Sequence, residues 1–220
     1  MPAAGCARGV GDEPRSYLKC LGPDAFVQDV FMDSDTDVMV LSFVPSTREG
    51  EPLTIEEAAA AREIVGQLEG THRLILHGRV NPNQDGDVED MQRLRDDFGI
   101  QAWKTYTQWG PDGEGFFLTD EDTGIKFMDE AKRLDVPVIA IHKGIPFGQQ
   151  SYEHSLCTDV GPAAKVYPDI SLLIYHSGLI PGQPEGPYDP ERGEGIDSLV
   201  RTVIENDLKG QNVYAELGST

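Results

Sequence analysis

The sequence predicts an α/β protein in which helices cover a parallel sheet. Apolar, β-branched stretches alternate with helical patterns at intervals that suit one strand–helix unit. Most of these stretches are apolar at consecutive positions, as strands are when both of their faces are buried. Two of them, Val138–His142 and Leu172–His176, end in a histidine just before a glycine-containing turn. Polar side chains at the carboxyl ends of successive strands are typical of the active site of a (β/α) barrel.

Six strands are expected from the apolar stretches. They are Asp37–Val44, Arg73–Val80, Gln101–Tyr106, Val136–His142, Ser171–His176 and Asn212–Leu217. The expected helices are Asp24–Met32, Thr54–Leu68, Val88–Phe98, Asp120–Leu134, a short one near Pro162–Val166, and Gly195–Leu208. Thr54 precedes Glu57 at the spacing of a capping box, which supports a helix start at this point.

Two architectures fit this alternation, a closed eight-stranded barrel and an open doubly wound sheet. A nucleotide-binding doubly wound sheet is disfavoured, because no glycine-rich phosphate loop follows the first strand. We therefore predict a partial (β/α)8 TIM barrel, with about strands two to seven in one incomplete domain over residues 21–220. Missing strands would leave unpaired sheet edges, so we expect a fragment. Residues 1–20 are rich in Gly, Ala and Pro and are predicted to be a flexible segment.

The net charge and the cysteines of the chain disfavour some classes of function. The 220 residues carry a formal net charge of −20, which disfavours binding to nucleic acid or to an anionic membrane surface. The three cysteines, Cys6, Cys20 and Cys157, form no CxxC pair and are predicted to be reduced thiols. We expect a cytoplasmic protein with a small-molecule substrate, while an export signal on a longer parent chain and a homo-oligomer are left open.

His142 and His176 occupy the same place on consecutive strands. A lone histidine there is more often structural, but two in register favour a shared role. Neutral imidazole binds Zn²⁺ well, and a second imidazole nearby can act as a general base near neutral pH. We predict a catalytic or metal-binding role for the pair.

Three other ionisable residues are candidates for the site. Lys104 lies in the apolar stretch 102–106, where its amine either reaches solvent at the strand end or contacts a substrate carboxylate or, once carbamylated, a metal. Glu216 could contact the reacting centre or orient a ligand. Arg79 could bind a substrate carboxylate or form a structural ion pair. Lys143 is expected to point to the opposite face as a surface or loop cation.

Several stretches together share the pattern of one enzyme family. They are Phe31–Asp37, Leu41–Pro45, Gly78–Asn83, Trp103–Thr107, Ile141–Gly144, Tyr175–Gly178 and Asn212–Gly218. With them the chain resembles the amidohydrolase-related family of metal-dependent TIM-barrel hydrolases, in the branch that contains aminocarboxymuconate-semialdehyde decarboxylase-like enzymes. The resemblance runs from about Tyr17 to Thr220.

The resemblance implies roles for the two histidines. His142 would be the metal ligand at the end of barrel strand five, and His176 would polarise or deprotonate the metal-bound water. Zinc is the expected ion, with manganese as an alternative. The family's HxH pair on strand one and its aspartate on strand eight are not matched in this sequence. A catalytic zinc usually keeps three protein ligands, so weak metal binding by this chain is expected.

The expected function is therefore a metal-dependent hydrolase that acts through metal-activated water on a small organic amide, ester or lactone, with or without a carboxylate group. His176 and Lys104 are the predicted catalytic residues, Arg79 and Glu216 the predicted substrate-binding residues, and His142 the predicted metal ligand. A metal-dependent decarboxylase on the same scaffold and a catalytically incompetent barrel fragment are the alternatives.

Overall fold

The computed structural model of the chain describes residues 22–146, 151–184 and 186–218. The flexible segment predicted for residues 1–20, with Cys6 and Cys20, lies outside the described residues. The chain divides into two compact units. One comprises Met1–Leu41 and Leu53–Leu76, and the other comprises Ser42–Pro52 and His77–Thr220.

The first unit is a pair of helices beside two short strand segments. Helix α2 (Pro23–Val27) continues into a π-helical turn and packs against α3 (Ile55–Glu69). The capping box at the start of α3 is present, because the Thr54 hydroxyl accepts from the Glu57 N–H and the Glu57 carboxylate accepts from the Thr54 N–H. Strand β1 (Met39–Leu41) pairs in parallel with the first half of β2 (Leu74–Arg79).

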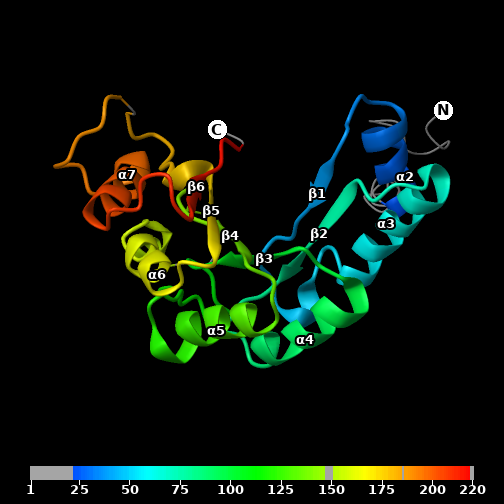
Figure 1. The fold of residues 1–220 in the computed structure, drawn as a ribbon, viewed down its shortest axis with the longest axis horizontal. Coiled ribbons are helices and arrows are strands. Elements are labelled where there is room, and N and C mark those ends of the chain that lie inside the picture. Colours follow the sequence, from blue (N-terminus) through cyan, green and yellow to red (C-terminus); the bar gives the residue numbers. More distant parts are fainter. Residues whose placement is uncertain (1–21, 147–150, 185, 219–220) are drawn as a thin grey trace, which may run out of the picture. The chain divides into compact units, whose positions relative to one another are not determined.

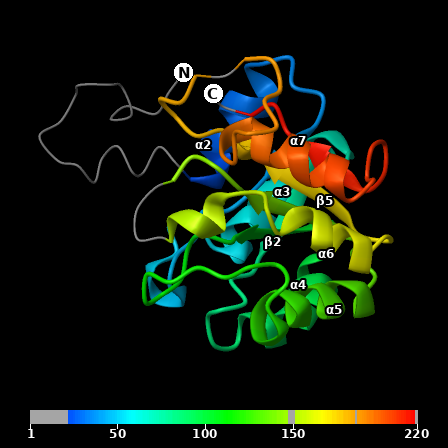
Figure 2. The ribbon, with the colours of Figure 1, turned by 90° about the vertical axis from the view of Figure 1, so that its left-hand side faces the viewer.

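The second unit contains the rest of the sheet and its helices. The second half of β2 pairs with β3 (Ala102–Tyr106), which is followed in turn by β4 (Val138–His142), β5 (Ser171–Tyr175) and β6 (Val213–Ala215). All of these pairs are parallel. The helices between the strands are α4 (Asp87–Phe98), α5 (Lys126–Arg133), α6 (Val160–Val166) and α7 (Gly195–Glu205). Figures 1 and 2 show α4 beside α5 and α6 beside α7.

The order of the strands distinguishes the two expected architectures. Along the sheet the order is β1-β2-β3-β4-β5-β6, so each strand pairs with the next one in the sequence. A doubly wound sheet reverses its order at a switch point, whereas a barrel winds in one direction. The fold is therefore α/β with the strand order of a partial TIM barrel, as the sequence predicts.

Each predicted strand and helix that has described residues is found. The strands at both ends of the sheet are shorter than predicted. The expectation that the strands are buried on both faces is right for β3, which is buried throughout, and for most of β4. It is wrong for β5 and β6. In β5, Leu172 and Ile174 are fully buried while Leu173 and Tyr175 are half-buried, and Tyr214 in β6 is 50% exposed. Helix α6 contacts both strands, and only the face that the helices cover is closed.

In the part of the chain that the structure describes, no helix has the length and apolar character that crossing a bilayer requires.

Candidate functional site

The register of β3, β4 and β5 brings ring side chains together where the strands end. Tyr106 pairs with His142, and His142 pairs with Tyr175. Paired residues in a parallel sheet point to the same face, so these three rings form a row across three strands. Lys104 is two residues before Tyr106 in β3 and lies on the same face. This group, with His176 and Glu216, is called the rim cluster below.

The two predicted histidines are neighbours in the structure. The ring centroids of His142 and His176 are 4.7 Å apart, with the planes at 69° to each other. The Tyr106 ring stacks on His142, and the centroids of these two rings are also 4.7 Å apart. His142 is 6% exposed, and its Nε2 is 3.2 Å from the carbonyl oxygen of Ile145. The juxtaposition that the sequence predicts is therefore present, while the chemical roles of the two rings stay predictions.

His176 is presented by a turn with unusual backbone geometry. His176 and Ser177 have φ values of 58° and 51°, in the left-handed region that non-glycine residues seldom occupy. Two such residues in sequence cost on the order of 1–3 kcal/mol each, which is typical of functional sites. The Nδ1 atom of His176 is buried and has no hydrogen-bond partner among the described residues. An unpaired ring nitrogen on a strained turn is available to a ligand.

Glu216 stabilises this turn from the end of β6. Its Oε2 accepts a hydrogen bond of 3.0 Å from the backbone N–H of His176, and its carbonyl oxygen accepts one of 2.8 Å from the Ser177 hydroxyl. Its own N–H donates to the carbonyl oxygen of Ile174 at 3.0 Å. Of the two roles weighed for Glu216, this geometry matches orientation of a neighbouring residue. Its predicted contact with substrate stays a prediction.

Lys104 is enclosed by aromatic rings. It is 1% exposed, so the alternative in which its amine reaches solvent is wrong. Its Nζ atom is 3.4 Å from the ring centroid of Tyr175 and 4.6 Å from that of Tyr106. No hydrogen-bond acceptor for Nζ is present among the described residues. Burial lowers the pKa of Lys104 to about 7, against the opposing influence of the Glu216 carboxylate.

The buried imidazoles are held neutral at neutral pH. Burial, helped by the positive charge of Lys104, lowers the pKa of His142 to about 3. The same two causes lower the pKa of His77 to about 4. His77 contacts the Ser42 hydroxyl, with 3.0 Å between its Nδ1 and Oγ. The sequence gives no signal for this contact, because Ser42 follows β1 and is 35 residues away from His77.

Lys143 is buried, and its prediction as a surface or loop cation is wrong. Its Nζ donates to the Asp159 carboxylate at 2.7 Å and to the carbonyl oxygen of His154 at 2.9 Å, with neither charged side chain more than 3% exposed. The second Asp159 oxygen accepts from the N–H of Leu118 at 2.8 Å. The space that Lys143 enters is not solvent, because the side chain is fully buried there. This ion pair is structural.

Arg79 pairs with Lys104 in the sheet register and takes part in an ion-pair network. It is paired with Glu51, donates to the carbonyl oxygen of Ser46 at 2.9 Å, and lies 3.6 Å from Asp87. Arg48 pairs with the same Asp87 at 3.0 Å. This geometry matches the structural alternative for Arg79. Its substrate-binding role stays a prediction.

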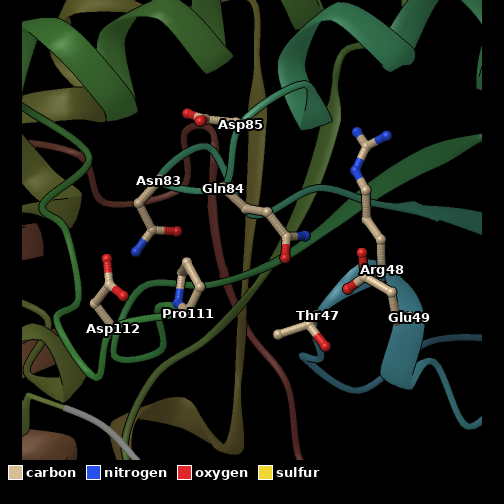
Figure 3. A pocket seen from close by; sticks show the side chains of 8 residues that line it. All are labelled: Thr47, Arg48, Glu49, Asn83, Gln84, Asp85, Pro111 and Asp112. Atoms are coloured by element: carbon tan, nitrogen blue, oxygen red, sulfur yellow. The ribbon is translucent and has the colours of Figure 1, made fainter.

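A separate polar cavity lies among the loops that follow β1, β2 and β3 (Figure 3). Its volume is about 360 Å³. Its lining residues are Thr47, Arg48, Glu49, Asn83, Gln84, Asp85, Pro111 and Asp112. None of the predicted site residues is among them.

The described residues do not by themselves form a metal site. No group of three or more His, Cys, Asp or Glu side chains lies close enough to hold an ion in the described ranges. Nε2 of His142 faces the carbonyl oxygen of Ile145. Lys104 carries an amine and not the carboxylate that could serve as a further metal ligand. Two imidazoles are fewer than the ligand set of a catalytic zinc. Zinc or manganese dependence stays a prediction drawn from the family resemblance.

Comparisons with known proteins support the fold. No protein-family model matches the chain, and no curated protein matches its sequence. An uncharacterised TIM-barrel protein from Bordetella bronchiseptica has a similar structure, with a TM-score of 0.59 and 11% identity over 91% of this chain and 65% of that chain. A dihydropyrimidinase from Brevibacillus agri has a TM-score of 0.45 and 15% identity over 82% of this chain and 38% of that one.

These two structures differ in how strongly they support a conclusion about the fold. The chain spans about two thirds of the TIM-barrel protein and well under half of the dihydropyrimidinase. The first shows that the chain has a TIM-barrel fold. The second is too distant in structure to carry an argument. The class defined by fold and geometry is therefore a TIM-barrel α/β protein with a cluster of ionisable rings at the carboxyl ends of its strands.

Proposed function

We propose that the chain carries part of the active site of a TIM-barrel hydrolase that acts on a small carboxylated amide, ester or lactone. The observation that supports this most directly is the rim cluster. It joins two imidazoles at 4.7 Å to an amine without a hydrogen-bond partner, at the end of the strands where barrel enzymes have their active sites.

His176 is the proposed proton-transfer residue. Its Nδ1 lacks a partner among the described residues, so it can accept a proton from an attacking water and return one to the leaving group. His142, whose low pKa keeps it neutral, fixes the position of the neighbouring ring by direct contact. Glu216 holds the backbone from which His176 projects. In this scheme each residue contributes geometry or a proton, and none of the steps depends on a bound ion.

Lys104 is the proposed recognition point for the substrate carboxylate. An ammonium buried without an acceptor is costly, and a carboxylate would supply the acceptor that it lacks. Binding would therefore favour the protonated amine and draw only anionic substrates to the rim cluster. Arg79 and Glu216 remain proposed contributors to substrate binding, and His142 remains the proposed ligand if the protein uses zinc or manganese.

A decarboxylase is the second candidate. The buried aromatic surroundings of Lys104 favour it, because a carboxylate moved out of water into such a site is destabilised and loses CO₂ more readily. Release of CO₂ without water addition would distinguish the two reactions. A barrel without any catalytic activity is the third possibility weighed.

A substrate screen with matched variants tests the proposal. The chain is assayed against carboxylated amides, esters and lactones and against their uncharged counterparts, with and without added Zn²⁺ or Mn²⁺. His176→Ala and Lys104→Met should lower kcat/KM by at least about 100-fold. The exposed controls His72→Ala and Lys126→Met should leave it unchanged. Equal rates in the rim and control variants would refute the proposed function.

A further inference from the structure

We infer that Gly144 is a positioning residue that sets the spacing between the rings of His142 and His176. Gly144 lies in the turn that follows β4, two residues after His142, and this turn contacts the one that begins at His176. The effect of Gly144 on catalysis rests on the proposed function, whereas its effect on the spacing of the two rings does not.

The turns that follow β4 and β5 meet backbone against backbone. The N–H of Ile145 donates to the carbonyl oxygen of Leu179 at 2.7 Å. A Cβ placed on Gly144 would lie less than 3.0 Å from backbone atoms of Gly178 and Leu179, which is closer than real Cβ atoms come. Gly144 also has a φ of 69°, in the left-handed region that favours glycine. This close approach therefore leaves no room for a side chain at position 144.

The turn after β4 is also held from its other side. The N–H of Gly144 donates to the carbonyl oxygen of Ser155 at 2.7 Å, and its carbonyl oxygen accepts from Nε2 of Gln108 at 3.1 Å. Beside it, Nζ of Lys143 donates to the Asp159 carboxylate at 2.7 Å. A retreat of the turn would break these bonds and leave buried polar groups unsatisfied, which is costly. The contact at Gly144 therefore fixes how closely the two turns approach.

The turn that presents His176 is held in a similar way. The Glu216 carboxylate accepts from the N–H of His176 at 3.0 Å, and the Glu216 carbonyl oxygen accepts from the Ser177 hydroxyl at 2.8 Å. A Cβ placed on Gly178 would lie 2.7 Å from Sγ of Cys157, which is fully buried. This turn is therefore enclosed by packed atoms, and a displacement of either turn changes its position relative to the other.

The two rings move with these turns. Nε2 of His142 is 3.2 Å from the carbonyl oxygen of Ile145, so this ring contacts the turn that contains Gly144. His176 is part of the other turn, which the N–H of Leu179 closes by donating to the His176 carbonyl oxygen at 2.8 Å. Relief of the Cβ contact to an ordinary distance of 3.4 Å needs a movement of roughly 1 Å, and a misplacement of that size can lower a rate about 100-fold.

Gly144→Ala tests the inference, with Gly210→Ala as the matched control. Gly210 has a similar φ of 74°, but a Cβ there meets nothing within 4 Å, so both variants carry left-handed strain and only Gly144→Ala carries the close contact. The nuclear Overhauser effect between the ring protons of His142 and His176 is measured in the whole chain. It should be present in the wild type and the control and lost in Gly144→Ala. Its persistence in folded Gly144→Ala, or its absence from the wild type, would overturn the inference.

A second pair of variants keeps the test decisive if Gly144→Ala does not fold. Gly178→Ala disturbs the opposite side of the same backbone contact, and Cys157→Ala removes the Sγ atom that the new methyl group would meet. The ring contact should be lost in Gly178→Ala and restored in the variant with both changes. An unfolding transition like that of the wild type shows that each variant is folded. A ring contact that survives in folded Gly178→Ala would also overturn the inference.

Catalysis gives a separate result. On the best substrate of the screen, Gly144→Ala should lower kcat about 100-fold and change KM little, because it displaces the reacting groups. Gly210→Ala should keep the wild-type values of both. A lost ring contact with unchanged kcat would refute the proposed function and support the role of Gly144 in spacing the rings. The failure of the inference and the failure of the proposed function are therefore distinguishable.

Discussion

Replacing Lys104 by methionine should make the protein more stable, and by an amount that depends on pH. The wild-type amine is buried without an acceptor, and burial lowers its pKa from 10.5 to about 7. Between these two values the unfolded chain binds more protons than the folded chain, so the free energy of unfolding rises with pH. The cost of burying the amine is therefore fully present below about pH 7 and is relieved as the pH approaches 10.5. Methionine has a similar volume and no charge.

The size of the effect follows from the pKa shift. Each unit corresponds to about 1.4 kcal/mol, so the amine costs about 4 kcal/mol at pH 7 and about 1 kcal/mol at pH 10. Loss of the contact between the ammonium and the Tyr175 face subtracts on the order of 1 kcal/mol. We therefore expect Lys104→Met to raise the free energy of unfolding by about 3 kcal/mol at pH 7 and by only about 1 kcal/mol at pH 10, where the folded amine is neutral and no ammonium contact is lost.

Urea unfolding at several pH values between 6 and 10 measures this difference. Wild type and Lys104→Met are compared at each pH, so that the titration of other groups cancels. The exposed Lys126→Met variant serves as control and should follow the wild type at every pH. A variant that is less stable than the wild type at pH 7, or a difference that does not change with pH, would refute the account of Lys104 as a buried amine without a partner.

Three further predictions concern the neighbouring groups. Asp159→Asn should lower the free energy of unfolding by about 3–5 kcal/mol, because it leaves the Lys143 charge buried and unpaired; chemical denaturation measures this, and a loss below about 1 kcal/mol contradicts it. Glu216→Ala should cost about 1–3 kcal/mol, because it removes the carboxylate that accepts from the His176 N–H; an unchanged thermal midpoint would count against that role. The pKa of His142, lowered to about 3, means that the unfolded chain binds more protons between pH 3 and 6.5. Stability should therefore fall as the pH drops through this window, and His142→Phe should weaken that dependence in acid denaturation curves; a slope equal to that of the wild type would argue against a buried neutral ring.

The sequence predicts most of the fold because its signals are local. Strands such as 138–142 are marked by consecutive apolar residues, and the helix that begins at Ile55 is marked by its capping box. The closeness of His142 and His176 could also be predicted, since the two residues lie at the carboxyl ends of consecutive strands. These predictions need only the residues that are adjacent in sequence and the spacing of apolar residues along each element.

The remaining features depend on contacts between distant segments. Lys143 is buried because Asp159, 16 residues later, meets its amine, and alternation along the strand does not contain that information. The contact of Ser42 with His77 joins residues that are 35 positions apart in the sequence. The left-handed conformation of His176 occurs at a position without glycine, so the residue type does not predict it. The half-covered face of β5 depends on what packs against it rather than on its own composition.

The double-variant cycle of His142 and His176 tests the central claim, that the two rings act in one site, most directly. The value of kcat/KM is measured for the wild type, His142→Ala, His176→Ala and the variant with both changes, on the best substrate of the screen. Residues that act as a unit are not additive, so the double variant should lose no more than the worse single variant. Losses that simply multiply, or full activity without either ring, would contradict the shared site.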